Sequence, residues 1–105
     1  MIGRMTLAAM LCLAAGAASA DSIDGNWCQE KGARRFSISG PSIVTPAGSR
    51  TTGDYTRHAF SYVVPSGDPD AGVTIRMHLM GEEHVQVQEG GAAPVIWNRC
   101  GPSIS

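Results

Sequence analysis

The side chains that could carry chemistry in this 105-residue sequence are three histidines, nine carboxylates and three cysteines. A histidine becomes a general base when a nucleophile and an orienting acid lie beside it. His58 stands in the stretch YTRHAFSYVV, where alternation places it on the same face as Phe60 and Tyr62. No Ser-His-Asp or Cys-His pattern accompanies it. We therefore expect no catalytic residue, and a histidine either at the rim of the domain or in a pocket beside Tyr62.

The other two histidines could be considered as metal ligands. His78 and His84 lie on the outward face of an expected hairpin, with Glu82 and Glu83 in the loop between them. Diagonal neighbours on paired strands lie about 7–8 Å apart, and no third ligand has a fixed spacing. We therefore expect solvated polar residues here, no metal and no cofactor.

A long loop, residues 65–72, contains the segment DPDAG and begins like a calcium-binding loop. Leu79 stands where the closing glutamate of such a loop would be, which argues against calcium. Binding residues are concentrated on loops that rigid scaffolds hold in place. We therefore expect Ser66, Asp68 and Asp70 to contact a ligand or partner, together with His58 and Tyr62.

The first twenty residues have the features of a secretory signal peptide. Arg4 precedes an apolar run over residues 5–18, and Ala18-Ser19-Ala20 has the small-x-small pattern of a cleavage site. The run is shorter than the roughly twenty residues that a membrane-spanning helix needs. We expect residues 1–20 to be a signal peptide, residues 21–105 to form one exported domain without a membrane span, and the location to be periplasmic or extracellular.

Cleavage leaves two of the three cysteines. Cys12 lies within the leader, and Leu11 before it does not fit the small residue that a lipoprotein site needs. Cys28 and Cys100 remain as a matched pair in an oxidising compartment, so we expect a disulfide between them. In the chain-entropy model, a loop of this length contributes roughly 4 kcal/mol to stability.

The charge of the chain argues against nucleic acid as a partner. Without Arg4, seven of the eight basic residues remain beside nine acidic ones, a formal charge near −2. The arginines are scattered except for Arg34 and Arg35, so no basic stripe forms. A single lysine against seven arginines, with abundant alanine and glycine, suggests a bacterial genome rich in GC. We expect a monomer whose partner is a protein or a small molecule.

The elements that must position these residues are short β-strands. Alternating or apolar runs are separated by Gly, Pro, Ser and Asp clusters at intervals of about ten residues, which is typical of an antiparallel sandwich or barrel. We expect seven strands, with residues 50–54 as a possible eighth. Their ranges are 23–29, 34–39, 42–46, 55–64, 73–80, 84–89 and 95–100.

The clearest hairpin covers residues 73–89. Its apolar residues alternate on both strands, and a three-residue loop at Gly81-Glu82-Glu83 places the two apolar sets on one face. A one-residue slip would invert every side chain, so the pattern selects the longer loop. We expect an interior made from this hairpin and its neighbours: Phe36, Ile38, Phe60, Tyr62, Ile75, Met77, Leu79, Val85, Val87 and Trp97.

The two ends of the domain show matching alternation. Gly25 and Trp27 share one face with Cys28 opposite, and Trp97 and Arg99 share one face with Cys100 opposite. Both cysteines can then meet on one side while both tryptophans turn to the other. The sequence therefore predicts an all-β, small antiparallel barrel of 7–8 short strands in a meander, with first and last strands adjacent and disulfide-linked.

The residues Gly25, Trp27 and Arg99 resemble the calycins, the lipocalin-like barrels. In that family the first strand carries Gly-x-Trp and the last strand supplies an arginine that stacks on the tryptophan. The resemblance implies barrel closure by Gly25, Trp27, Trp97 and Arg99, and a cup for a small apolar ligand. Thr52-Gly53-Asp54-Tyr55 is also similar to the Ser-Gly-x-x-Tyr motif of periplasmic inhibitors of c-type lysozyme, which are disulfide-linked barrels of this size.

These observations favour a binding protein over an enzyme. A barrel of about eight strands is just wide enough for its own side chains or for one small ligand. The ten expected interior residues would fill most of that space, so we expect an exported, non-enzymatic binding module that uses loops or an outer face, for example to inhibit a hydrolase or to contact the envelope. The alternative is a calycin-like carrier of a small apolar ligand.

Overall fold

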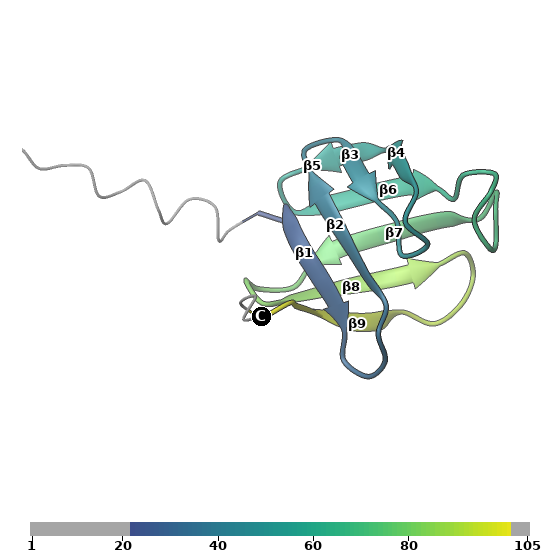
Figure 1. The fold of residues 1–105 in the computed structure, drawn as a ribbon. Coiled ribbons are helices and arrows are strands. Elements are labelled where there is room, and N and C mark those ends of the chain that lie inside the picture. Colours follow the sequence, from purple (N-terminus) through teal and green to yellow (C-terminus); the bar gives the residue numbers. More distant parts are fainter. Residues whose placement is uncertain (1–21, 102–105) are drawn as a thin grey trace, which may run out of the picture.

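The computed structural model describes residues 22–101, which form an all-β domain without helices in that range (Figure 1). The expected signal peptide lies outside the described residues. No helix within the described range could span a membrane. The strands are β1 (Gly25–Gln29), β2 (Arg35–Ser39), β3 (Ser42–Val44), β4 (Arg50–Thr52), β5 (Asp54–Thr56), β6 (Ala59–Val63), β7 (Thr74–Leu79), β8 (His84–Glu89) and β9 (Val95–Arg99).

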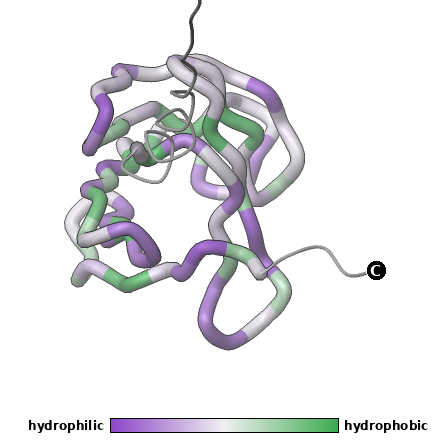
Figure 2. Tube along the Cα trace, turned by 90° about the vertical axis from the view of Figure 1, so that its left-hand side faces the viewer, coloured by the Kyte–Doolittle hydropathy of each residue, from purple (hydrophilic) through white to green (hydrophobic). Residues whose placement is uncertain are grey.

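The strands form one antiparallel sheet in the order β4-β3-β2-β1-β9-β8-β7-β6-β5. The expected pairing of first and last strands is confirmed, because β1 lies beside β9, with Trp27 opposite Arg99 and Gln29 opposite Trp97. The two edge strands, β4 and β5, are consecutive in the chain and are separated by Gly53 alone. The sheet therefore curls into a nearly closed barrel, and the chain runs around a central space when viewed along it (Figure 2).

The expected count of seven to eight strands is wrong, because the described residues contain nine. The segment expected as one strand, residues 55–64, folds back at Arg57-His58, so that Thr56 pairs with Ala59. This turn has no Gly, Pro, Asn or Asp to signal it. The possible eighth strand is present as β4, which pairs with β3.

Gly53 is required where β4 passes into β5. A Cβ atom at this position would lie 2.3 Å from the carbonyl oxygen of Ser61 and 2.8 Å from Phe60 Cε1. Real Cβ atoms do not approach backbone oxygens so closely, so a side chain here would push β5 away from β6. The Gly53 amide donates to the carbonyl of Pro41 at 2.9 Å. Close backbone approach at this corner thus brings the two edges of the sheet together.

The predicted register of the hairpin formed by β7 and β8 is confirmed. Leu79 lies opposite Val85 and Met77 opposite Val87. The amide of Met80 donates to the carbonyl of His84 at 2.8 Å, which closes a loop of three residues. The apolar side chains of both strands therefore point to the same face.

All ten side chains expected in the interior are buried. Four more belong to the same apolar cluster: Ile23, Trp27, Ile43 and Val64. The largest fully buried side chains include Trp27 and Phe60. Alternation along short strands was therefore enough to identify most of the core.

The predicted disulfide is present between Cys28 in β1 and Cys100, directly after β9, with Cα atoms 5.1 Å apart. The Cys100 amide also donates to the carbonyl of Asn26 at 3.1 Å, which extends the β1–β9 pairing. A disulfide is compatible with the exported location that we expect.

In an antiparallel sheet, successive connections lie alternately at the two ends of the strands, and here the connections at the two ends differ in length. The open end carries four loops, residues 30–34, 45–49, 64–73 and 90–94. The closed end carries three shorter connections, residues 40–41, 57–58 and 80–83, together with the entering segment 22–24. The described range begins and ends at the closed end, because Arg99, the last residue of β9, donates to the carbonyl of Ser22.

Candidate functional site

At the closed end, three of the four residues expected to close the barrel, Gly25, Trp27 and Arg99, lie together, whereas Trp97 lines the open end instead. The guanidinium carbon of Arg99 lies 4.3 Å from the ring centroid of Trp27. Its nitrogens donate to three backbone carbonyls at 2.7–2.8 Å, those of Ser22, Asp24 and Glu82. All three nitrogens of this guanidinium thus have a hydrogen-bond acceptor. Through them, Arg99 links residues 22–24 and the β7–β8 loop to β9.

Gly25 makes room for this arrangement. Its φ is +126°, and a Cβ atom there would lie 2.6 Å from Arg99 Nη1. Trp27 is fully buried beneath the guanidinium, and its indole N–H donates to the carbonyl of Ile23 at 2.9 Å. The closed end is therefore packed and its polar groups are satisfied.

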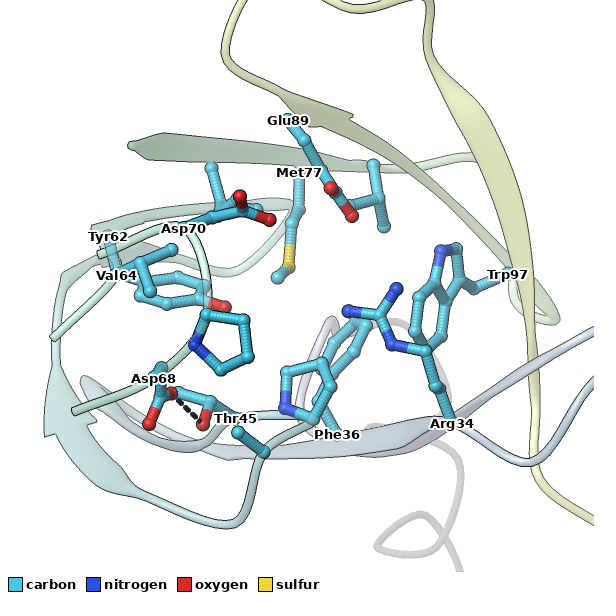
Figure 3. Close-up of a pocket in the computed structure, with 15 residues that line it drawn as sticks. Arg34, Phe36, Thr45, Tyr62, Val64, Asp68, Asp70, Met77, Glu89 and Trp97 are labelled. Carbon is cyan, nitrogen blue, oxygen red and sulfur yellow. Dashed lines mark hydrogen bonds between the residues drawn. The ribbon is translucent and has the colours of Figure 1, made fainter. Parts of the chain in front are cut away.

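At the open end, the core does not fill the barrel. A cavity of about 400 Å³ opens between the loops (Figure 3). This volume lies within the range of pockets that hold small molecules. Its wall is mostly apolar and its rim is charged; the lining residues are Arg34, Phe36, Thr45, Pro46, Ala47, Tyr62, Val64, Asp68, Pro69, Asp70, Ile75, Met77, Val87, Glu89 and Trp97. The packed interior expected from the sequence thus holds at one end of the barrel only.

Tyr62 carries the most informative polar group of the cavity. Its side chain is 6% exposed, and its hydroxyl points into the cavity (Figure 3). This hydroxyl makes no hydrogen bond with any residue in the range 22–101, although a buried tyrosine usually finds a partner. Burial, together with the negative charges of Asp68 and Glu89, raises the pKa of Tyr62 to about 12. The phenol is therefore neutral at physiological pH and can donate to a ligand.

Trp97 forms the aromatic wall opposite. It is 2% exposed, and its ring centroid lies 4.9 Å from that of Phe36. Its indole N–H, unlike that of Trp27, has no acceptor among the described residues. Two buried donors of the cavity, the phenol and this indole, thus have no partner among residues 22–101.

The rim of the cavity carries both signs of charge. Arg34 lies over the Trp97 ring, with its guanidinium carbon 5.7 Å from the centroid. Asp70 and Glu89 point into the cavity from the other side (Figure 3). Arg34, Asp70 and Glu89 make no side-chain hydrogen bond or ion pair within residues 22–101. Three charged groups therefore face the cavity without a hydrogen-bond or ion-pair partner in the described part of the chain.

Asp68 has a different role from its neighbours on the same loop. Its carboxylate accepts a hydrogen bond from Thr45 Oγ1 at 2.7 Å and another from the Ser49 hydroxyl. Thr45 itself is buried and accepts a bond from the Ser49 amide at 3.1 Å. These bonds fasten the 64–73 loop to the 45–49 loop, so the rim on this side is held in place.

The remaining predicted contact residues are not brought into the cavity. His58 lies in the exposed β5–β6 turn at the closed end, because the chain reverses there and the alternation with Phe60 is broken. Ser66 is exposed on the 64–73 loop and does not line the cavity. The structure thus brings together Tyr62, Asp68 and Asp70, and separates them from His58 and Ser66.

Two rim residues, Arg34 and Glu89, were not among the predicted sites, although the sequence contains a signal for them. Arg34 has the same parity as the interior residues Phe36 and Ile38, and Glu89 has the same parity as Val87. Each occupies the next inward position at the open end of its strand. Extending the alternation by one step would have placed both charges at the mouth.

A second hollow, about 490 Å³, lies on the outer face of β5 to β8. Its polar lining includes Arg76, His78, Gln86 and Gln88, all exposed or half-buried. Water can satisfy such groups without a ligand, so this groove is a weaker candidate than the cavity.

The groups that line the open end could bind a small molecule. Within the described range, no group of three His, Cys, Asp or Glu side chains could hold a metal ion. His84, one of the histidines considered as a ligand, instead forms a 2.7 Å hydrogen bond to Asn98 through Nδ1. The cavity offers apolar walls, hydrogen-bond donors and unpaired charges, and its lining contains no serine, cysteine or histidine.

Comparisons of this chain with protein-family models, with curated proteins and with solved structures found no significant match.

Proposed function

We propose that this protein is an exported, non-enzymatic binding protein that holds one small molecule in the open end of its barrel. The observation that carries the proposal is the Tyr62 hydroxyl, which is buried, unpaired within the described residues and directed into a cavity of about 400 Å³. Such a group needs a hydrogen-bond partner. A ligand that accepts a hydrogen bond from this phenol would take the place of the water that the open cavity admits.

The walls indicate what the body of the ligand must be. Phe36, Met77 and Trp97 present aromatic and thioether surfaces, and all three are less than 5% exposed. An apolar or aromatic ligand body would bury its own surface against them, at a gain of roughly 25 cal/mol per Å² of apolar area removed from water. The ligand of this proposal therefore combines an apolar body with a hydrogen-bond acceptor.

The calycin-like arrangement supports the same function. Gly25, Trp27 and Arg99 form the stacked closure that the resemblance implies. A ligand cup at the end opposite this closure fits such a barrel. The cavity therefore moves our preference from a module that acts through its loops to a carrier of a small ligand.

A fluorescence titration tests the proposal. The neutral ester 3,3-dimethylbutyl benzoate has an aromatic body and a carbonyl acceptor, and its binding should give a saturable change in Trp97 emission. Tyr62→Phe removes one hydrogen bond and should weaken binding about 2- to 12-fold, the equivalent of 0.5–1.5 kcal/mol.

The matched control is Tyr55→Phe. The Tyr55 hydroxyl donates to Asp24 at the closed end, so its loss should leave the affinity of the cavity unchanged. If neither this ester nor charged benzoate esters of the same length give a saturable signal, the proposal is wrong.

A further inference from the structure

The mouth of the cavity has an excess of negative charge. Asp68, Asp70 and Glu89 line it together with a single cation, Arg34. The formal charge of the whole sequence is only −1, so acidic groups are concentrated here. Asp68 is held by the hydroxyls of Thr45 and Ser49. The free carboxylates are therefore Asp70 and Glu89.

These two carboxylates lie on the same side of the cavity and are directed toward its centre (Figure 3). Glu89 is half-buried, which limits the water that can solvate its charge. Asp70 is exposed and has a φ of +67°, a conformation that few residues other than Gly, Asn and Asp adopt easily. Neither side chain bonds to another residue in the described range, so both are available to a ligand.

The charged groups that act on the Tyr62 hydroxyl are mainly negative. After burial, the largest influences on the pKa of Tyr62 are Asp68 and Glu89, which raise it, whereas Arg34 lowers it less. The hydroxyl oxygen lies inside the cavity, so the same charges act on any group placed beside it. A positive charge would be favoured there and a negative charge disfavoured.

The aromatic wall already holds a cation. The guanidinium of Arg34 lies over the Trp97 ring, and the indole face is the aromatic surface that attracts cations best. Arg34 is exposed and has no acceptor among residues 22–101, so only this weak contact holds it in place. A ligand cation could share or take over the position.

We infer that the ligand is an organic cation, an ammonium group on an apolar body, with its charge between the carboxylates of Asp70 and Glu89 and the face of Trp97. The inference rests on the proposed function and specifies the ligand class of that site. The apolar body lies against Met77 and Phe36, and its acceptor meets the Tyr62 hydroxyl. Arg34 repels the ligand charge and competes for the same ring.

Three benzoate esters of similar shape test this inference by titration at neutral pH and low salt. Benzoylcholine and 3,3-dimethylbutyl benzoate differ only in the exchange of a cationic nitrogen for carbon, and 4-(benzoyloxy)butanoate carries the opposite charge. We expect benzoylcholine to bind roughly tenfold more tightly than the neutral ester, by cation–π and ionic attraction. The anion should bind most weakly, and salt should reduce the difference.

Glu89→Gln and Asp70→Asn identify the counterions. Each should lower the affinity ratio of benzoylcholine to the neutral ester several-fold and leave the neutral ester unaffected. Asparagine tolerates positive φ, so the second change preserves the loop. Glu83→Gln, on the loop at the closed end, is the matched control and should not change the ratio.

Arg34→Gln should raise the affinity for benzoylcholine, whereas Arg35→Gln, one residue away and outside the cavity lining, should not. Because each ratio is measured within one variant, a reduced folded fraction cancels. If the neutral ester or the anion binds as tightly as benzoylcholine, or if the ratio survives both carboxylate changes, the cationic ligand is ruled out while the cavity function stands. If none of the three esters binds, the proposed function itself fails.

Discussion

Each end of the barrel has an arginine lying over a tryptophan, and the two pairs differ in almost every other respect. Arg99 lies 4.3 Å from Trp27 and donates to three backbone carbonyls. Arg34 lies 5.7 Å from Trp97 and has no hydrogen-bond acceptor in residues 22–101. All three guanidinium nitrogens of Arg99 are used by the fold, whereas those of Arg34 have no acceptor among the described residues.

The same difference extends to the neighbouring polar groups. At the closed end, the hydroxyl of Tyr55 donates to Asp24 and the indole of Trp27 donates to Ile23. At the open end, the hydroxyl of Tyr62 and the indole of Trp97 have no partners among the described residues. Unsatisfied buried groups are rare in native proteins. Their concentration at one end is the basis of the division that we propose, in which the closed end supplies stability and the open end binds a ligand.

The largest expected effect on stability comes from loss of the disulfide, which holds β1 beside β9. Replacing Cys28 and Cys100 by serine frees a loop of 72 residues and should lower the free energy of unfolding by about 4 kcal/mol. Urea denaturation of the variant, followed by tryptophan fluorescence, measures this loss. A change below about 1 kcal/mol would show that strand pairing alone joins β1 to β9.

Replacing each of the two arginines by alanine, in separate variants, distinguishes the contributions of the two ends to stability. Arg99→Ala removes the cation over Trp27 and leaves three carbonyls without their donor, so the free energy of unfolding should fall by about 3 kcal/mol. Arg34→Ala removes one exposed contact and should cost less than about 0.5 kcal/mol. Equal losses in thermal denaturation would contradict the division of roles.

An effect smaller than those of the disulfide and of Arg99 is a dependence of stability on acid at the closed end. Partial burial raises the pKa of Asp24, but hydrogen bonds from the Gly40 amide and from the hydroxyls of Ser22 and Tyr55 outweigh it and hold the pKa below its ordinary value. A carboxylate with a lowered folded-state pKa contributes stability above its unfolded pKa and loses it as the pH falls. The contribution should therefore begin to decrease as the pH falls below about 4, and it is lost completely only below the lowered folded-state pKa of Asp24.

Asp24→Asn is the variant that isolates this effect. Between neutral pH and pH 3, the wild type should lose about 1 kcal/mol more than the variant, after allowance for solvent screening. Thermal unfolding followed at a series of pH values provides the measurement. Parallel pH profiles for the two proteins would show that the Asp24 carboxylate does not stabilise the closed end.

Alternation in the sequence was sufficient to predict the interior, the register of the β7–β8 hairpin and the meeting of the two cysteines. It failed at Arg57-His58, because a two-residue turn without Gly, Asn or Asp gives no local signal. It also missed the corner at Gly53, whose need for a bare backbone comes from Ser61 and Phe60 on another strand.

The cavity could be predicted only in part. Parity places Arg34 and Glu89 inward, but whether side chains fill the space between them depends on how the loops pack. The bond from Thr45 to Asp68 joins residues 23 positions apart and follows no period. The size of the cavity depends on how several strands and loops pack together, so it cannot be predicted from any single segment.

Because the chain enters and leaves the domain at the closed end, the mouth faces away from both points of attachment. A tag, fusion partner or surface linker at either end should leave access to the cavity unobstructed. On a biosensor chip, protein immobilised through either end would therefore expose the cavity to the flowing solution.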